Sequence, residues 1–212
     1  MMSVRFVEYA ADLFRPIPYM DAIDIVNYAG RTCYQSHDKA LDDIDHKEQF
    51  IRNLIRNGHE SVLEHVSYTM DVRIDRGLLA EWTRHRIGSA YSVESTRYVN
   101  YAGKEVECIL PSGITGDARI RMMDAIEDAI QAYKEMVSDG VKPQIARAVL
   151  PQALAVNMVV THNVRQWRHI FKQRMENLYA HPDMRRMMIL CFNELVEKAE
   201  VFFSDIDVPV DI

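Results

Sequence analysis

The sequence predicts an α+β fold in a single domain spanning residues 1–212, with a small, mostly antiparallel sheet flanked by long helices. Residues 66–74 alternate apolar and polar side chains, which is typical of a strand with one buried face. Residues 118–138 and the stretch from Pro182 instead repeat apolar residues at helical spacing. A chain of 212 residues can bury a sizeable core, and no repeat or linker divides it.

The N-terminal part is predicted to contain a strand at 4–9 and helices at 21–34 and 47–57. In the first helix the expected inward face is Ala22, Ile25, Val26, Ala29 and Cys33. In the second helix it is Phe50, Ile51, Leu54 and Ile55, and Gly58 follows as the stop signal.

The remaining chain is predicted to alternate helices with short strands. We expect helices at 78–86, 118–138, 143–150, 163–177 and from 182 onward, strands at 96–101, 106–110 and 158–161, and a loop at 89–95. Asn163 is the expected N-cap of its helix, and Pro182 suits a first helical turn.

Charge and composition exclude several classes of function. The net charge of −6 argues against a general nucleic-acid binder, and no apolar run is long enough to span a membrane. The first residues lack a secretory pattern, so we expect a cytoplasmic protein. The three cysteines have neither metal-ligand nor redox spacing, which indicates reduced and mostly packed thiols.

Basic residues are concentrated between Val141 and Met175, where Asp and Glu are absent. A basic segment in an acidic protein fits a pocket for a small anion. The same residues could instead pair with carboxylates such as Asp42, Asp43 and Asp45, and charge alone leaves both interpretations open.

Residues 84–98 pack three arginines, three serines and one histidine into fifteen positions. Arginine forks and serine hydroxyls match phosphate oxygens, so this segment suits a multiply charged anion. Glu81, Arg84 and His85 would share one helical face. Basic residues at an exposed helix end are the structural alternative.

Arg174 stands on the apolar face of its predicted helix, in register with Trp167 and Phe171. Such an arginine needs an anion or an acceptor, unless its stem packs while its head reaches solvent. The functional interpretation sets its charge against a substrate oxygen that becomes negative during reaction.

The segment from His59 to His65 does not match a zinc motif, because His-Glu-x-x-His requires histidine at the position of Leu63. We therefore predict no metal site. Capping, loop or cofactor contacts are the favoured roles of His59 and Ser61.

Taken together, these motifs resemble the flavin-dependent thymidylate synthase family. The matching motifs are Arg84-His85-Arg86 with Ser95-Thr96-Arg97, Gly58-His59-Glu60-Ser61 with Glu64-His65, Ala146-Arg147 through Pro151, and Asn163-x-Arg165 leading to Arg174. The resemblance covers the chain from about Asp21 to Glu200.

The resemblance implies methylation of dUMP to dTMP. Methylenetetrahydrofolate would supply the carbon, and FAD reduced by NADPH would supply the hydride, without a cysteine nucleophile. It also implies a homotetramer with active sites at subunit interfaces. The implied FAD contacts are Ser61, Arg84, His85, Arg86, Asn163, Arg165 and His169. The implied dUMP contacts are Glu81, Arg84, Glu94, Ser95, Arg97, Arg147 and Arg174, and Arg174 is the implied catalytic residue, polarising the uracil ring.

The chain departs from the family pattern at several positions. Eight residues separate Arg86 from Ser95, where the family usually has seven, so this loop is expected to bulge or re-register. Glu81 replaces a common Gln and is expected to face the base or pair with an arginine. The other departures are Tyr91 or Ser92 in place of Asn, His169 in place of Asn, and Tyr179 or His181 at a usual His.

Two alternatives accompany the enzyme hypothesis. A non-catalytic nucleotide- or RNA-binding protein could use the same arginines for phosphates, and would bind with strong salt dependence and without flavin. A degenerate homologue could bind flavin and dUMP but turn over poorly because of the longer loop.

Overall fold

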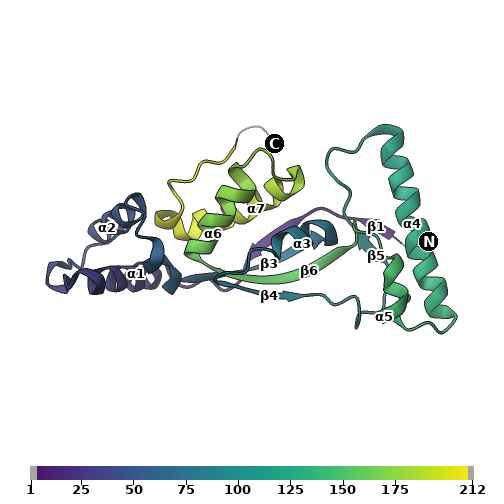
Figure 1. Ribbon diagram of the computed structural model, residues 1–212, viewed down its shortest axis with the longest axis horizontal. Coiled ribbons are helices and arrows are strands. Elements are labelled where there is room, and N and C mark those ends of the chain that lie inside the picture. The colour runs from purple at the N-terminus through teal and green to yellow at the C-terminus, as the bar shows by residue number, and fades with distance from the viewer. Residues whose placement is uncertain (1–3, 210–212) are drawn as a thin grey trace. The chain divides into compact units, whose positions relative to one another are not determined.

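Two nine-residue strands, β3 (Ser67–Asp75) and β6 (Ala155–Asn163), occupy the middle of a four-stranded sheet. The computed structural model describes residues 4–209 (Figure 1). The sheet order is β2-β3-β6-β4, with β2 at Ala10–Leu13 and β4 at Ser89–Val93. A second sheet pairs β1 (Val4–Phe6) with β5 (Val106–Cys108) in parallel.

Hydrogen bonds give the direction of the central strands. The Val164 amide donates to the Val66 carbonyl at 2.9 Å, and the hydroxyls of Thr69 and Thr161 lie 2.8 Å apart. Numbering rises along one strand as it falls along the other, so β3 and β6 are antiparallel. The α+β class with an antiparallel sheet is therefore confirmed.

The helices are α1 (Tyr19–Tyr34), α2 (Ile44–Arg56), α3 (Arg76–Trp82), α4 (Gly116–Ser138), α5 (Pro143–Ala146), α6 (Val164–Phe171) and α7 (Pro182–Ala199). A π-helical segment, Lys172–Glu176, continues directly from α6. Among the described residues, no helix has both the length and the apolar character needed to cross a membrane.

The chain forms two compact units. Unit 1 contains the residues up to Ala10, Val72–Arg84 and Ser92–Met158. Unit 2 contains Ala11–Asp71, His85–Tyr91 and the residues from Val159 onward.

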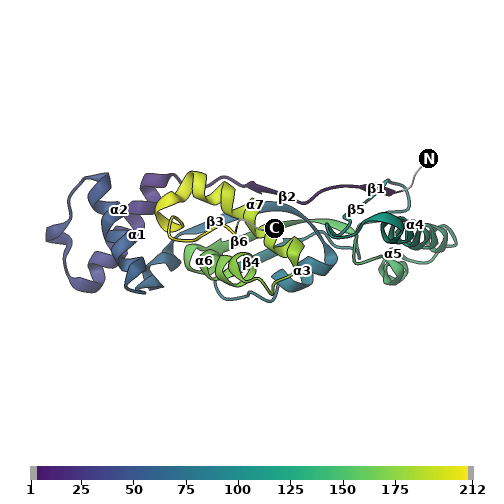
Figure 2. The same cartoon turned by 90° about the horizontal axis from the view of Figure 1, so that it is seen from above.

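Unit 2 has an aromatic core between α6, α7 and the segment that follows α7. The Phe171 ring lies 5.6 Å from Trp167, 5.3 Å from Phe192 and 5.8 Å from Phe203. In the same unit α1 packs against α2 (Figure 2). Unit 1 is built around α4, whose Ile126, Ile130 and Tyr133 are buried. The Tyr133 hydroxyl accepts a hydrogen bond from the Tyr101 amide at 3.3 Å.

The predicted inward face of α1 is partly wrong. Ala22 and Val26 are buried as expected, but Ile25 and Cys33 are exposed, and Gly30 is buried instead. A Cβ on Gly30 would lie 2.8 Å from the Phe50 ring. The close approach of α2 therefore selects the glycine face of α1.

Two predictions between 89 and 101 are also wrong. Residues 89–93 form strand β4 rather than a loop, because pairing with β6 outweighs a serine-rich composition with little strand propensity. Residues 96–101 are not a strand, since the amides of Tyr98 and Val99 both donate to the Ser95 carbonyl and close a turn.

Candidate functional site

The His85–Gly88 turn in unit 2 is tied to the start of α6. Gly88 has φ of +63°, and its carbonyl accepts a hydrogen bond from the Asn163 amide at 3.0 Å. The Asn163 side chain caps α6 as predicted, because its Oδ1 accepts from the Gln166 amide at 2.8 Å. A Cβ on Gly88 would lie only 2.4 Å from Asn163 Nδ2. The turn therefore needs glycine for both its φ and its close approach.

Three further side chains hold this turn. The Tyr91 hydroxyl donates to the His85 carbonyl at 2.5 Å, and a 2.7 Å hydrogen bond joins Ser89 Oγ to His162 Nδ1. His162 is fully buried, which together with the nearby His85 lowers its pKa to about 3. The buried ring is therefore neutral at physiological pH and acts as an uncharged support of the turn.

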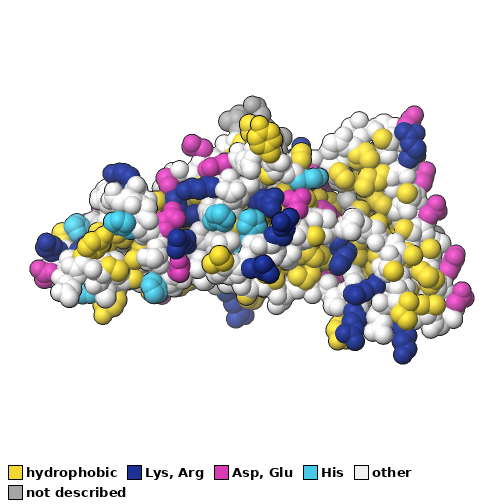
Figure 3. Space-filling model, in the orientation of Figure 1, with side chains coloured by type: hydrophobic (Ala, Val, Ile, Leu, Met, Phe, Trp, Pro, Cys, Tyr) yellow, Lys and Arg dark blue, Asp and Glu magenta, His cyan; other side chains and the backbone are white. Residues whose placement is uncertain are grey.

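One cavity opens beside this turn within unit 2, and a second cavity adjoins it. The first, of about 370 Å³, is lined by Glu60, Glu64, Ile87, Asn163, Arg165, Gln166 and His169. The other, of about 350 Å³, shares Glu60 and Arg165 with the first and includes Ser61 and His59. Basic and histidine side chains are exposed together over the part of unit 2 that carries α6 (Figure 3). Four of the predicted cofactor residues, Ser61, Asn163, Arg165 and His169, thus line these cavities.

Arg174 lies in the π-helical segment and contacts His85. Its Nε donates to His85 Nε2 at 3.1 Å, and the His85 ring meets the His169 ring edge-on at 5.9 Å. The Arg174 side chain is half-buried rather than fully exposed. The predicted catalytic arginine is therefore held against His85, which in turn contacts His169.

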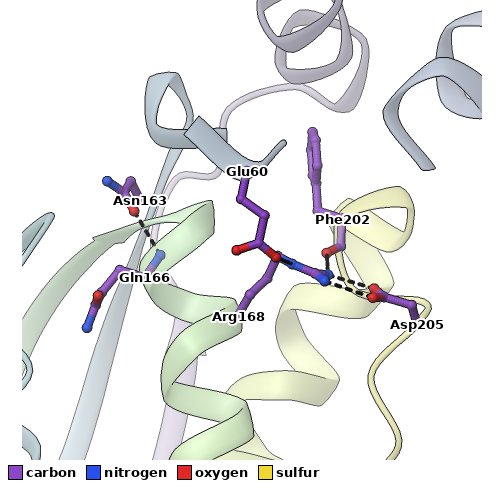
Figure 4. A network of polar contacts seen from close by, with 6 residues as sticks. All are labelled: Glu60, Asn163, Gln166, Arg168, Phe202 and Asp205. Carbon is purple, nitrogen blue, oxygen red and sulfur yellow. Dashed lines mark hydrogen bonds and ion pairs between the residues drawn. The ribbon is translucent and has the colours of Figure 1, made fainter. Parts of the chain in front are cut away.

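Arg168 stands at the centre of a buried ion-pair network that the sequence did not reveal (Figure 4). Its side chain is 1% exposed, and its Nη1 and Nη2 donate to the two carboxylate oxygens of Asp205 at 2.6 and 2.7 Å. Nη1 also donates to the Phe202 carbonyl at 2.6 Å, and Nε donates to Glu60 Oε1 at 3.4 Å. Arg168 thus confirms the carboxylate-pairing alternative for one member of the basic segment.

The carboxylates lining the first cavity are both paired. Glu60 pairs with Arg168, and Glu64 accepts from Arg165 at 2.5 Å.

Asp42 and Asp43, considered above as partners of the basic segment, instead make local contacts. Asp42 pairs with Lys47, and Asp43 caps α2.

Unit 1 collects three of the predicted nucleotide residues at the turn after β4. The Arg97 amide donates to Ser95 Oγ at 3.3 Å, and Arg147 Nη1 donates to Thr96 Oγ1 at 3.3 Å. Arg97 Nε donates to Gln144 at 3.2 Å. Arg97 and Arg147 are both exposed, so their guanidinium groups lie at the surface. Glu94 accepts from the Tyr101 hydroxyl at 2.6 Å, so it is already engaged within unit 1.

The helix preceding the turn is shorter than predicted. It ends at Trp82, so Glu81, Arg84 and His85 do not share one helical face. Thr83 forms the C-cap through its backbone amide, and its hydroxyl donates to the Leu79 carbonyl at 3.0 Å. This side-chain hydrogen bond competes with the backbone hydrogen bonds of the helix, and the spacing of apolar residues does not reveal it. Arg84 belongs to unit 1, whereas His85 and the exposed Arg86 belong to unit 2.

His59, His181, Tyr179 and Ser92 have simple local environments. His59 makes no capping hydrogen bond, contrary to one predicted role, and its Nδ1 instead lies 2.8 Å from the Tyr34 hydroxyl. His181 caps α7 by accepting from the Asp183 amide, while Tyr179 and Ser92 are exposed. Within residues 4–209, no group of three or more His, Cys, Asp or Glu side chains is placed to hold a metal ion.

Comparison with known proteins identifies the family. A family model described as thymidylate synthase complementing protein matches residues 17–200. The flavin-dependent thymidylate synthase of Mycobacterium sp. strain JLS is 36% identical over 206 residues, covering 87% of this chain and 80% of the relative. The chain belongs to the flavin-dependent thymidylate synthase family.

Other members and solved structures agree with this assignment. The flavin-dependent thymidylate synthase of Mycobacterium tuberculosis is 35% identical over 202 residues, covering 87% of this chain and 79% of the relative. Thymidylate synthase X from Helicobacter pylori, solved with FAD and dUMP, has a TM-score of 0.75 at 23% identity, covering 93% of this chain and 98% of that one. A UMP/dUMP methylase from Streptomyces cacaoi bound with 5-Br dUMP has a TM-score of 0.78 at 21% identity, covering 94% and 95%. These structures show the same fold.

Family membership makes the Gly88 turn testable through FAD. Replacing Gly88 with alanine is expected to weaken FAD binding roughly tenfold, because a left-handed alanine costs about 1–2 kcal/mol and its Cβ would also press on Asn163. Quenching of flavin fluorescence measures the affinity. Gly103→Ala is the matched control, since a Cβ there meets nothing within 4 Å. Equal affinities in the two variants would show that the turn does not shape the FAD site.

Proposed function

We propose that this enzyme methylates dUMP to dTMP, taking the carbon from methylenetetrahydrofolate and using FAD that is reduced by NADPH. The observation that carries the proposal is the position of Arg174, which is hydrogen-bonded to His85 beside a cavity lined by Asn163, Arg165 and His169. Family membership supports thymidylate synthesis with a flavin. The folate and NADPH roles rest on the resemblance of the motifs.

The residues around the two cavities fit FAD. Arg165 and the exposed Arg86 supply charged donors suited to a diphosphate. Glu60 and Glu64 would repel phosphate if they were unpaired, but each is neutralised by an arginine. Cavities of this size are typical of sites for small molecules and cofactors. Ser61, Arg84, His85, Asn163 and His169 complete the set proposed to hold FAD. Once reduced by NADPH, the bound flavin would supply a hydride to the methylene carbon.

Arg174 is proposed to act on the uracil ring. A guanidinium beside a pyrimidine oxygen stabilises the negative charge that develops there, and this increases electron density at C5 of the ring. The hydrogen bond from Arg174 Nε to His85 fixes the direction of the guanidinium plane. No thiol is required, which fits the two buried cysteines. Cys108 is buried with its pKa raised to about 12, and burial also raises the pKa of Cys191.

Ser95, Arg97 and Arg147 are proposed to hold the dUMP phosphate. The two guanidinium groups are at the surface of unit 1, and the Ser95 turn orients the neighbouring backbone. Glu81, Glu94 and Arg84 are proposed as further dUMP contacts, with the carboxylates directed to the base rather than to the phosphate.

We also propose a cytoplasmic homotetramer whose active sites lie at subunit interfaces. Large apolar side chains next to the proposed site residues are unusually exposed. Tyr179 is 99%, Ile87 85%, Tyr98 78% and Leu178 73% exposed. Apolar groups at such positions favour burial against another subunit.

Flavin spectroscopy tests the proposal on wild-type protein. The FAD-loaded protein should be bleached by NADPH under anaerobic conditions, and methylenetetrahydrofolate with dUMP should then restore the oxidised flavin spectrum. A protein that binds RNA in a salt-dependent manner and ignores FAD would support the non-catalytic alternative instead. Flavin binding without turnover would indicate a degenerate homologue.

A further inference from the structure

We propose that Arg185 is a positioning residue that fixes Arg174 by holding the π-helical segment in place. This inference rests on the proposed role of Arg174 and adds a residue that none of the motifs above assigns to the site. Arg185 lies in the first turns of α7, while Arg174 lies in Lys172–Glu176.

The first observation is a direct hydrogen bond between the two elements. Arg185 Nε donates to the carbonyl of Met175, the residue next to Arg174, at 3.2 Å. A π-helix is rare and occurs mostly as a single turn within an α-helix, frequently at functional sites. The Arg185 contact thus bonds the backbone one residue from the proposed catalytic side chain.

The second observation is the burial of the Arg185 charge. The residue is 7% exposed, and its buried Nη2 has no hydrogen-bond partner among the described residues. No carboxylate of residues 4–209 forms an ion pair with it, in contrast to Arg168, whose buried charge is matched by Asp205 and Glu60. A buried charge without a counter-ion destabilises a fold, and an apolar side chain would be cheaper at this position.

The two observations together favour positioning over stability. Arg185 retains a costly buried charge while contacting a single carbonyl in the segment that carries Arg174. Burial also anchors the contact, because the surrounding core prevents the guanidinium from moving away. Met175 is itself fully buried, so the residue that supplies the carbonyl and the residue that supplies the donor are both packed in the core.

Arg186 provides a matched control on the same helix. Its side chain is 45% exposed and lies 3.8 Å from Asp183, whereas the hydrogen bond to the Met175 carbonyl comes from Arg185. Arg186→Gln therefore removes an equal charge from α7 without touching the proposed link.

The experiment compares Arg185→Met with Arg186→Gln in FAD-loaded protein and combines each with Arg174→Ala. Arg185→Met should lower kcat for dTMP formation about 10- to 100-fold, because small displacements of a positioned group cost this much. FAD affinity and the flavin spectrum should remain unchanged, since Arg185 lines neither of the two cavities. In the absence of Arg174, adding Arg185→Met should lower kcat no further.

Hydrogen exchange and a conservative variant report on the Arg185 link independently of Arg185→Met turnover. Backbone amides of residues 172–177 should exchange faster with deuterium in Arg185→Met but not in Arg186→Gln, and Arg185→Lys should recover part of kcat because it keeps a donor. If Arg185→Met fails to fold, Arg185→Lys carries the comparison. Multiplicative losses in the double variant, or unchanged kcat and exchange, would overturn the inference. Absence of dTMP formation by wild-type protein would instead refute the proposed function, and the exchange result would still report on the link.

Discussion

Replacing Arg174 with alanine is expected to lower dTMP formation about 100- to 1,000-fold, the loss seen when one preorganised donor to a developing negative charge is removed. FAD binding should be retained, because the cavity residues Asn163, Arg165 and His169 come from other positions and remain in place. The measurement is the initial rate of dTMP formation, together with the quenching of flavin fluorescence.

Gln173→Ala provides the control for this variant. Gln173 is an exposed neighbour in the same π-helical segment, so its replacement tests whether disturbing the segment alone is sufficient. Arg174→Lys should recover little activity, because lysine keeps the charge but loses the planar fork. Turnover within a few fold of wild type in Arg174→Ala would remove this residue from the mechanism.

Replacing Asp205 with alanine is expected to lower the free energy of unfolding by about 2 kcal/mol at neutral pH. Removing one member of a fully buried ion pair costs about 3–5 kcal/mol, and the effect is smaller here because the Asp205 side chain is 48% exposed. The loss arises because Arg168 stays buried with only Glu60, at 3.4 Å, as a carboxylate partner. Urea denaturation measures the change.

The same pair predicts a pH dependence of stability. Hydrogen bonds from Arg168 hold the pKa of Asp205 below its ordinary value. The folded pKa is depressed, so this stabilisation is present above the unfolded pKa of about 3.9 and is lost as pH falls through the lower folded pKa. The difference between wild type and Asp205→Ala should therefore shrink in acid. Asp207→Ala, at an exposed position outside the network, should show neither effect. A constant difference across this range would mean that the carboxylate charge does not stabilise the fold.

Sequence periodicity correctly predicted the helices and strands whose buried face coincides with their apolar residues. The alternation at 66–74 matches β3, where Tyr68, Met70, Val72 and Ile74 are buried, and Val66 just before the strand is buried as well. The helical apolar repeat predicted from Pro182 onward also matches α7, whose Met184, Met188, Cys191 and Leu195 are buried. Strand β4 escaped prediction because its stability comes from pairing with β6. The α1 face was misread because contact with α2, rather than periodicity, decides which side is buried.

In the candidate site, too, local sequence predicted some features and tertiary contacts determined others. Asn163 was predicted as an N-cap from local sequence, and its second role against Gly88 appears only when β4 and β6 pair. The sequence did not distinguish Arg168 from its basic neighbours, because its carboxylate partners Glu60 and Asp205 lie 108 and 37 residues away in the chain. The π-helical segment also has no local signature that helical periodicity would detect. Tertiary contacts therefore determine which arginines serve ligands and which serve the fold.

Direct detection of the product tests the central claim. Wild-type protein should convert dUMP to dTMP when FAD, NADPH and methylenetetrahydrofolate labelled in the methylene carbon are all present, and the label should appear in the thymine methyl group. Omitting FAD or the folate should abolish the product. Unchanged dUMP in the complete mixture with FAD-loaded protein, or equal dTMP formation without FAD, would contradict the proposed function.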